Sequence, residues 1–282
     1  MQQILNRNRV RKAFDRAAES YDEAAVLQKE VCSRLLEKLD LVKITPEWIL
    51  DAGSGTGGAI RPLQKKYKKA DVALLDLSER MLLKAEKNTV LFKKAHAVCG
   101  DLEANPFVDN QFGLIFSSLA LQWCNDISAT LAELKRVLEP GGLLIFATFG
   151  PDTLKELRAS WQKVDHAAHV NAFIDMHDIG DILMQLGFAE PVMEAEVITV
   201  NYNSVDLLMQ DLRDIGANVT ASGQNNGMLT PNKLNQLRDA YERFRQNDVL
   251  PASYEIIYGH AWVAENKQPS EEKVASINVK LS

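Results

Sequence analysis

The stretch Ile49-Leu-Asp-Ala-Gly-Ser-Gly-Thr-Gly-Gly58 joins a short apolar run to an acidic residue and then to alternating glycines. This order is typical of a β-strand that ends in a tight loop before a helix. Gly53, Gly55 and Gly57 lack the Cβ atoms that would keep a ligand away from the backbone, and the loop amides face the crevice beyond the strand. The stretch therefore predicts a nucleotide-type pocket at the carboxyl end of a parallel strand.

Asp51, two residues before the first of these glycines, narrows the class of ligand. A dinucleotide site places a pyrophosphate on a helix N-terminus and uses the spacing G-x-G-x-x-G without a neighbouring charge. A carboxylate at this position repels phosphate and attracts an ammonium group. Because the aminoacyl tail of S-adenosylmethionine carries an ammonium group, this cofactor is the expected ligand.

Four further segments follow in an order that supports the same pocket. Asp76 ends the apolar run 70–76 and can accept both hydroxyls of a ribose, while Asp101 follows a second short run and can accept an adenine amino group. With the apolar segments 112–123 and 136–146, the ordered set resembles the motifs of class I S-adenosylmethionine-dependent methyltransferases. A single glycine loop would be weak support, but the ordered set is specific. The expected cofactor-binding residues are Asp51, Gly53, Gly55, Gly57, Asp76, Leu77, Met81, Asp101, Leu102 and Ser118.

The resemblance implies an α/β fold, with a doubly wound, Rossmann-like, seven-stranded and mostly parallel sheet. A chain of 282 residues can bury one α/β core and an appended element. About fifty residues separate the last two expected strands, which is too many for a turn and predicts a helical cap. The expected parts are an N-terminal helical lid (1–45), a core (46–202 and 252–264), the cap (203–251) and a disordered tail (265–282).

Composition narrows the possible partners. The 46% of hydrophobic and 25% of charged residues are ordinary for a globular protein, and the net charge of -6 argues against non-specific binding to nucleic acid. No apolar run approaches the roughly 20 residues of a membrane span, and the N-terminus has no signal-peptide core. The sequence therefore predicts a cytoplasmic protein without a membrane or nucleic-acid partner.

The cysteines and histidines do not predict a metal site. Cys32, Cys99 and Cys124 lie far apart, so neither a disulfide framework nor a zinc site is expected. His166 and His169 have a spacing that could place both rings on one helical face, but they lack the H-E-x-x-H pattern. No metal is therefore expected.

The N-terminal segment 9–25 has helical propensity and an apolar stripe. Phe14, Ala17, Ala18 and Tyr21 fall at positions i, i+3, i+4 and i+7. The stripe is consistent with a helix that only packs on the core, and also with a lid that places Tyr21 over the cofactor pocket.

Gln122 and Trp123 follow the fourth expected strand, where this fold keeps its acceptor pocket. Both are candidate catalytic residues beside Tyr21. For Trp123 the alternative is packing under the following helix.

Segments outside the cofactor motifs narrow the family. These segments are Phe14-x-x-Ala-x-x-Tyr-Asp22, Leu121–Asp126, Leu212–Ala217, Leu229–Pro231 and Pro251–Trp262. In them the chain resembles, over residues 8–264, the malonyl-acyl-carrier-protein O-methyltransferases of biotin synthesis. The resemblance implies methyl transfer from S-adenosylmethionine to the free carboxylate of a malonyl group on acyl carrier protein. The N-terminal segment also occurs in arginine hydroxylase assembly factors of respiratory complex I, and spacing alone does not exclude that alternative.

This resemblance also directs attention to cations in the cap. A guanidinium can hold a carboxylate bidentately, so Arg213 is the candidate for binding the malonyl carboxylate, unless it is an ordinary surface arginine. Carrier proteins are acidic, so a basic face is expected, unless the same cations form an ordinary solvated helix surface. The candidate docking residues are Lys233, Arg238, Arg243 and Arg245. The carrier (acyl carrier protein or coenzyme A), the acyl chain length and the oligomeric state stay open.

Overall fold

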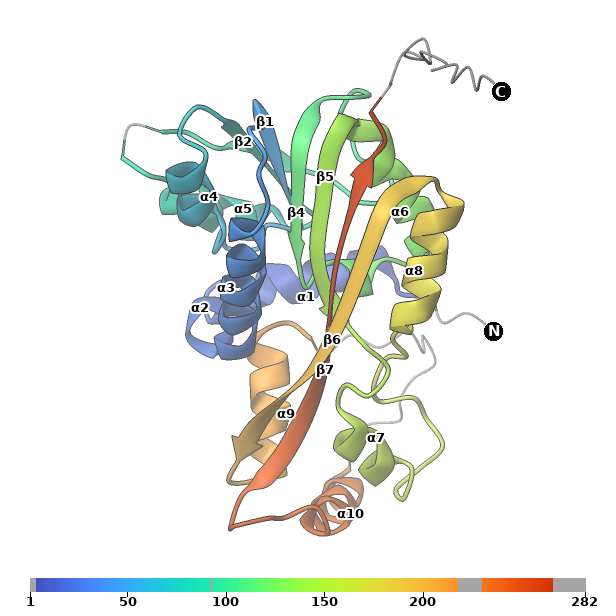
Figure 1. The fold of residues 1–282 in the computed structure, drawn as a ribbon. Coiled ribbons are helices and arrows are strands. Elements are labelled where there is room, and N and C mark those ends of the chain that lie inside the picture. Colours follow the sequence, from blue (N-terminus) through green and yellow to red (C-terminus); the bar gives the residue numbers. More distant parts are fainter. Residues whose placement is uncertain (1–3, 92, 218–229, 266–282) are drawn as a thin grey trace, which may run out of the picture.

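The computed structural model describes residues 4–91, 93–217 and 230–265 (Figure 1). Within these residues seven strands form one sheet in the order β3-β2-β1-β4-β5-β7-β6. Neighbouring strands are parallel except β7, which runs antiparallel to both β5 and β6. This topology confirms the doubly wound, mostly parallel sheet expected from the sequence. The strands are β1 (Trp48–Ala52), β2 (Asp71–Asp76), β3 (His96–Cys99), β4 (Phe112–Ser118), β5 (Leu138–Phe149), β6 (Phe188–Tyr202) and β7 (Leu250–Val263).

Helices cover both faces of the sheet (Figure 1). The buried side chains of α3 and α4 belong to one hydrophobic cluster, and those of α6 and α8 belong to a second cluster. The central strands β1 and β4 are apolar on both faces because each face is covered by helices. No helix in the described part of the chain has the length and hydropathy needed to cross a membrane. The helices are α3 (Val26–Asp40), α4 (Ile60–Lys66), α5 (Glu79–Ala85), α6 (Ile127–Val137) and α8 (Met176–Gln185).

The N-terminal segment differs from the single helix expected over residues 9–25. It forms α1 (Arg7–Ala17) and a short α2 (Tyr21–Ala24), separated by a turn. At this turn the Ser20 hydroxyl donates hydrogen bonds to the carbonyls of Ala17 and Asp214. The break changes the direction of the chain but keeps the expected apolar stripe together, because Phe14, Ala17, Ala18 and Tyr21 still share one cluster with Met81.

The cap is carried by a two-stranded ribbon. β7 pairs with β5 only from residue 256 onward, whereas it pairs with β6 along its whole length. The first part of β7 and the end of β6 therefore extend beyond the sheet, and two helices between these strands, α9 (Val205–Asp214) and α10 (Pro231–Glu242), lie beside this extension (Figure 1). Tyr241 is fully buried and its hydroxyl donates to the Pro251 carbonyl at 3.0 Å. The sequence also predicts a polar, glycine-rich turn around Gly223 and Gly227 within the cap. That turn and the tail 266–282 lie outside the described residues.

Helix α7 is shorter than the sequence suggested. A helix is expected over residues 152–164, but α7 spans Lys155–Trp161. The preceding backbone is held by β7 instead, because the Leu154 amide donates to the Ser253 carbonyl at 2.6 Å and the Asp152 amide donates to Glu255. Long-range hydrogen bonds therefore override local helical propensity here.

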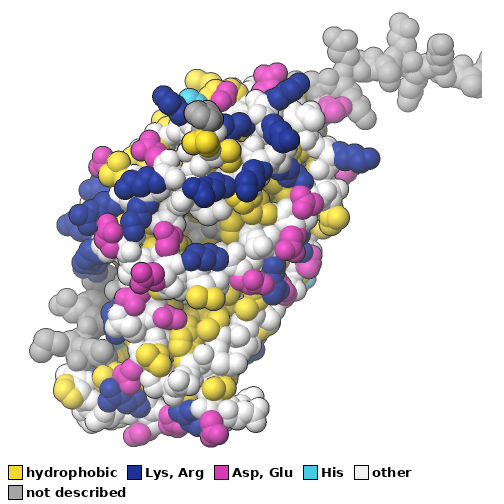
Figure 2. Space-filling model, turned by 90° about the vertical axis from the view of Figure 1, so that its left-hand side faces the viewer, with side chains coloured by type: hydrophobic (Ala, Val, Ile, Leu, Met, Phe, Trp, Pro, Cys, Tyr) yellow, Lys and Arg dark blue, Asp and Glu magenta, His cyan; other side chains and the backbone are white. Residues whose placement is uncertain are grey.

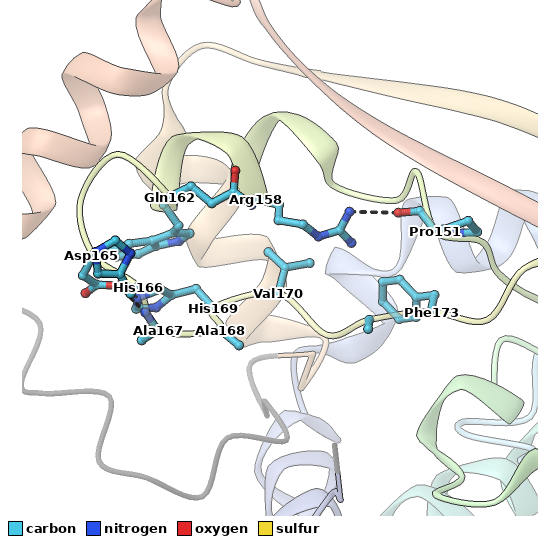
Figure 3. A pocket seen from close by; sticks show the side chains of 12 residues that line it. Pro151, Arg158, Gln162, Asp165, His166, Ala167, Ala168, His169, Val170 and Phe173 are labelled. Atoms are coloured by element: carbon cyan, nitrogen blue, oxygen red, sulfur yellow. Dashed lines mark hydrogen bonds and ion pairs between the residues drawn. The ribbon is translucent and has the colours of Figure 1, made fainter. Parts of the chain in front are cut away.

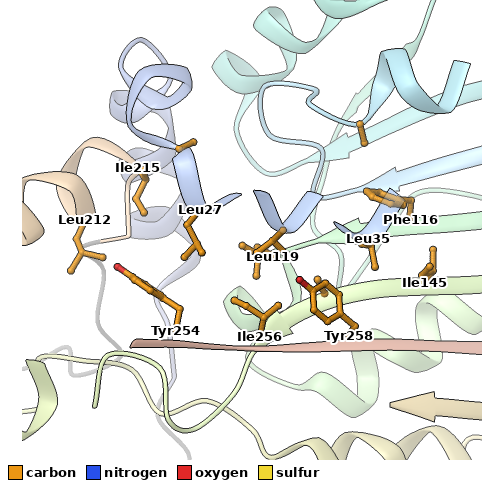
Figure 4. Close-up of a cluster of buried hydrophobic side chains, with 14 of the residues drawn as sticks. Leu27, Leu35, Phe116, Leu119, Ile145, Leu212, Ile215, Tyr254, Ile256 and Tyr258 are labelled. Carbon is orange, nitrogen blue, oxygen red and sulfur yellow. The ribbon is translucent and has the colours of Figure 1, made fainter. Parts of the chain in front are cut away.

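Replacement of Leu35 by alanine should lower the free energy of unfolding by about 2–5 kcal/mol, because the side chain is fully buried and the change leaves a cavity. Figure 4 shows Leu35 of α3 facing Phe116 and Ile145 of the sheet. Denaturant unfolding measures the change. Leu41→Ala is the matched control: this leucine is 86% exposed, and its loss should change stability by no more than about 0.5 kcal/mol. Equal effects of the two substitutions would contradict the described packing of α3.

Candidate active site

Two adjoining cavities lie where β1, β2 and β4 end. The first, here called the nucleoside cavity, is bordered by Met81 and by segments that follow β2, β3 and β4, and the second, the glycine-loop cavity, is bordered by α2, α3 and the glycine loop. They share Tyr21, Gly53, Gly55 and Ser118. The structure brings all ten candidate cofactor residues to these cavities. Gly53, Gly55, Asp76, Leu77, Met81, Asp101, Leu102 and Ser118 line the nucleoside cavity, and Asp51 and Gly57 line the other.

The three glycines of the loop have different roles. All three have positive φ angles, which residues other than glycine rarely adopt. A Cβ atom on Gly53 would lie 2.1 Å from the Ala120 Cβ, and one on Gly57 would lie 2.4 Å from the Ile60 Cδ1. A Cβ atom on Gly55 would meet nothing within 4 Å. Gly53 and Gly57 are therefore needed for packing within the protein, and only Gly55 leaves open space for a ligand, a distinction that the sequence does not make.

Asp51 has a buried carboxylate oxygen that meets no hydrogen-bond donor in the described part of the chain. Its side chain is buried, and its Oδ2 atom has no partner among the described residues. Burial and the nearby Asp76 raise the pKa of Asp51 to about 7. A cationic group at this oxygen would supply the missing interaction and favour the ionised form. The site therefore fits the ammonium group of S-adenosylmethionine.

Asp76 is held in place by the backbone. Its Oδ2 accepts a hydrogen bond from the Gly55 amide and its Oδ1 accepts one from the Ser78 amide, both at 2.8 Å. Burial raises the pKa of Asp76 to about 6, although these two amide donors act in the opposite direction. Each carboxylate oxygen retains a further lone pair, so the arrangement can still accept ribose hydroxyls.

Asp101, the candidate acceptor for the adenine amino group, already has a cationic partner. The Arg7 Nε atom lies 3.0 Å from its Oδ2, and Arg7 also pairs with Glu103. The Asp101 Oδ1 atom accepts a hydrogen bond from the Glu103 amide. Arg7 thus attaches α1 to the segment after β3, a contact that the sequence analysis missed because nothing in the local sequence connects residues so far apart.

Two further contacts hold α1 and α2 over the cofactor cavities. The Ser78 hydroxyl donates to Asp15 at 2.7 Å, and the Thr56 hydroxyl donates to Asp22 at 2.6 Å. Tyr21, at the start of α2, borders both cavities. These contacts hold the N-terminal segment beside both cofactor cavities.

A third cavity, here called the acceptor cavity, adjoins the first two at Tyr21. Gln122 and Trp123 both line it, as do Phe149 and Tyr254. The Gln122 amide donates to the Leu119 carbonyl at 2.6 Å and accepts from the Thr148 hydroxyl. Trp123 packs against Phe14 of α1 in an edge-to-face contact with ring centroids 5.2 Å apart.

No lysine or arginine is present among the described residues that line the acceptor cavity. Arg213, the candidate for the substrate carboxylate, is exposed, and its guanidinium donates to the Gln210 side chain at 2.8 Å. The geometry therefore gives no support to a carboxylate-binding role for Arg213. Tyr21, His169 and Tyr254 are the ionisable side chains of the described lining.

His169 is positioned by two neighbours at the far end of the acceptor cavity. Its ring stacks on Trp161 with centroids 3.7 Å apart, and its Nε2 lies 2.8 Å from the Asp165 Oδ1 (Figure 3). Burial alone would raise the pKa of Asp165, but hydrogen bonds from Lys233 and His169 outweigh it and lower this pKa to about 2. No group of three or more potential metal ligands gathers in residues 4–91, 93–217 and 230–265. His169 therefore belongs to the wall of the acceptor cavity.

A fourth cavity, here called the outer cavity, shares His169, Val170 and Phe173 with the acceptor cavity (Figure 3). Arg158 lines this outer cavity. Its guanidinium donates to the carbonyls of Pro151 and Thr153 at 2.8 and 3.1 Å. Burial lowers the pKa of Arg158, and Asp152 acts in the opposite direction. The arginine thus fixes the turn before α7.

Comparison with known proteins agrees with this site. The methyltransferase domain family matches residues 50–146. A malonyl-[acyl-carrier protein] O-methyltransferase of Gallionella capsiferriformans is 47% identical over 265 residues, which cover 92% of this chain and 91% of that protein. The protein of the same name from Laribacter hongkongensis is 48% identical over 265 residues, which cover 91% of this chain and 89% of that protein.

Solved structures agree in fold. YcgJ of Bacillus subtilis has a TM-score of 0.57 at 15% identity and covers 83% of this chain and 99% of its own. Phosphoethanolamine N-methyltransferase 2 of Haemonchus contortus, solved with S-adenosyl-L-methionine, has a TM-score of 0.51 at 18% identity and covers 89% of this chain and 57% of its own. The fold and the domain family together define a class I S-adenosylmethionine-dependent methyltransferase. The close relatives place the chain in the malonyl-[acyl-carrier protein] O-methyltransferase family.

Two alanine substitutions should separate ligand approach from packing in the glycine loop. Gly55→Ala should cost only about 1–2 kcal/mol of stability, the cost of a left-handed backbone, but weaken cofactor binding at least about tenfold because the new methyl group occupies open space. Gly57→Ala should lose more stability, because its Cβ also meets Ile60 and Ala85. Thermal unfolding and calorimetric titration with S-adenosylmethionine measure both effects. Unchanged cofactor affinity in Gly55→Ala would show that the ligand does not approach this glycine.

Cofactor affinity should fall about tenfold when the pH is lowered from 8 to 6, because Asp51 must be ionised to pair with an ammonium group and its pKa is about 7. Below pH 7 binding should therefore release a proton, which calorimetry in buffers of different ionisation enthalpy detects. Since the folded protein holds this proton more tightly than the unfolded chain does, the ligand-free protein should lose stability as the pH rises from about 4 to about 7. Asp51→Asn should bind weakly at pH 8 and release less proton on binding below pH 7. Equal proton release by both proteins would exclude Asp51 as the titrating group.

Proposed function

We propose that this chain transfers the methyl group of S-adenosylmethionine to the free carboxylate of a malonyl group carried by acyl carrier protein. The names of its close relatives support this substrate. The observation that carries the proposal is the position of the acceptor cavity, which adjoins both cofactor cavities, with Tyr21 as the one described residue that lines all three. By the same proposal, the reaction belongs to biotin synthesis and occurs in the cytoplasm. No comparison favours the alternative, arginine hydroxylation.

The chemistry needs no general base from the protein. A malonyl carboxylate is ionised at neutral pH, so one of its oxygens can form the new bond to the methyl group while the bond between that methyl and sulfur breaks. The protein has to align these atoms and exclude water. α1 and α2 cover the cofactor side, and the apolar side chains of Leu119, Phe149 and Leu212 line the acceptor side.

The acceptor cavity is suited to a reactive carboxylate. The part of its wall that the structure describes carries no lysine or arginine, so no fixed cation would hold the carboxylate away from the methyl group or weaken it as a nucleophile. The sulfonium of the cofactor then supplies the opposite charge. The reaction removes both charges, because it yields a neutral ester and a neutral thioether sulfur.

Tyr21 is the group best placed to orient the carboxylate. Its hydroxyl has no hydrogen-bond partner among the described residues. Burial, together with Asp76 and Asp22, raises the pKa of Tyr21, so the phenol stays protonated and can donate a hydrogen bond. One bond from this phenol orients a carboxylate oxygen without neutralising its charge.

The proposed reaction is tested by incubating the protein with methyl-labelled S-adenosylmethionine and malonyl-acyl carrier protein. Label should appear on the carrier as a methyl ester that mild alkali releases. Tyr21→Phe should lower kcat by about tenfold, a loss typical of one hydrogen bond to a charged group, and leave the cofactor Kd nearly unchanged. Tyr67→Phe is the matched control, because the Tyr67 hydroxyl is buried without a partner among the described residues and Tyr67 lines neither the cofactor cavities nor the acceptor cavity. No labelled ester with the wild-type protein would disprove the function, whereas full activity of Tyr21→Phe would remove only the role of Tyr21.

A further inference from the structure

Docking of an acidic carrier requires a local basic surface, because the chain has a net charge of -6. The sequence points to α10 and the residues just after it, but most of the cations there form ion pairs within the protein. Only Arg243 of the four candidates has no carboxylate partner among the described residues, and its guanidinium lies 4.5 Å from the Phe244 ring centroid. The ion pairs of the other three are Lys233–Asp165, Arg238–Asp206 and Arg245–Glu242.

Helix α1 presents a different surface. Arg9, Lys12 and Arg16 are all exposed, and their spacing of i, i+3 and i+7 places them on one side of the helix. None of the three has a carboxylate within ion-pair distance in the described part of the chain. The acidic residue of this helix, Asp15, instead accepts a hydrogen bond from Ser78. These three cations are here called the α1 basic stripe.

The opposite side of the same helix faces the reaction site. Val10 and Phe14 line the nucleoside cavity, and Phe14 also lines the acceptor cavity. An α-helix with its side chains is about 10–12 Å wide, so the stripe lies about that far from the cavities. A partner bound to the stripe could therefore extend a flexible thioester arm around the helix to the acceptor cavity.

The side-chain contacts of Arg7 and Asp15 attach α1 to the core. The ion pairs of Arg7 with Asp101 and Glu103 hold the first turn of the helix on the core. Further along, the bond between Ser78 and Asp15 attaches the helix to the start of α5. The stripe is thus presented by a helix fixed on its inner side.

We propose that the α1 basic stripe is the docking surface for the acidic acyl carrier protein. The inference rests on the proposed function, because it takes the carrier as the source of the malonyl group. The three unpaired cations span about 10 Å along the helix axis, a length that matches two turns of an acidic helix on a partner. Their charges attract such a partner at long range, and their position directs its thioester arm to the acceptor cavity.

A second basic surface provides a control. Figure 2 shows Lys and Arg side chains gathered over the upper part of one face, where α4 and its neighbours lie. Lys65, Lys68 and Lys69 are exposed at the end of α4. They lie just before β2 begins, so they are at the amino ends of the strands, away from the cavities at the carboxyl ends. Reversal of these three charges changes the net charge as much as reversal of the stripe.

The test compares Arg9→Glu/Lys12→Glu/Arg16→Glu with Lys65→Glu/Lys68→Glu/Lys69→Glu. With malonyl-acyl carrier protein, the stripe variant should lose at least about tenfold in kcat/KM at low salt, and its dependence on ionic strength should become flatter. The control variant should stay within about twofold of the wild type. With malonyl-N-acetylcysteamine, a thioester too small to contact the outer side of α1, both variants should keep wild-type activity.

Other outcomes would overturn the docking surface. Equal losses in the two variants would show an effect of net charge alone. A loss on the small thioester would show that the changes disturb the lid, and an equal loss on malonyl-coenzyme A would show that the stripe binds phosphates. Calorimetric titration with holo carrier protein that lacks the malonyl group measures docking without turnover. Wild-type binding that survives in the stripe variant would refute the docking surface even if methyl transfer stands, whereas absent methyl transfer by the wild type would refute the proposed function.

Discussion

Two buried carboxylates at neighbouring strand ends are the constraint around which this site is built. Asp51 and Asp76 end β1 and β2, and these strands lie side by side in the sheet. Burial raises the pKa of each carboxyl group. The nearby Asp76 adds to the rise at Asp51, and Asp15 adds to the rise at Asp76. At Asp76 two backbone amides donate hydrogen bonds that favour the ionised form. One oxygen of Asp51, by contrast, has no donor among the described residues. A cationic ligand completes the site, so the same groups that destabilise the empty protein provide affinity for S-adenosylmethionine.

The N-terminal segment keeps water away from the two carboxylates at the strand ends. Without α1 and α2 the strand ends would face water, and solvation would remove much of the attraction between Asp51 and an ammonium group. Hydrogen bonds of Asp15 and Asp22 and the ion pairs of Arg7 hold the segment over the cavities. Tyr21 then stands where the cofactor and acceptor sides meet. In the proposed reaction, cofactor binding and acceptor orientation are therefore linked through one short segment.

Sequence alone was enough for the sheet and for the gathering of the candidate cofactor residues around two adjoining cavities, because both depend on local patterns. An apolar run followed by an acid or glycine gives a strand end, and parallel strands bring such ends together. The acceptor side depends on pairs that are distant in sequence. Arg213 was chosen for its charge, yet its helix turns it to solvent. The role of Arg7 and the pairing of Lys233 with Asp165 depend on tertiary contacts across the chain, for which the local sequence carries no signal.

The glycine loop and the segment 152–164 illustrate the same division. The spacing predicts the loop glycines, but only the folded structure shows that Gly57 is packed against Ile60 and Ala85 whereas Gly55 faces open space. In the second case helical propensity overestimated α7, because hydrogen bonds to β7 hold the preceding residues.

The ribbon formed by β6 and β7 has a mechanical consequence. Its hydrogen-bond ladder runs without a hinge from the sheet to the point where β7 begins at Leu250. The segment that supplies Leu212 and Ile215 to the acceptor cavity lies between these two strands, so the ribbon connects it to the core sheet. Because the ribbon is continuous with the sheet, the acceptor wall and the strand ends at the cofactor cavities belong to one hydrogen-bonded framework. Proteins with this ribbon could therefore exchange one acyl acceptor for another through changes at its outer end, where α9 and α10 lie, with no change where the methyl donor binds.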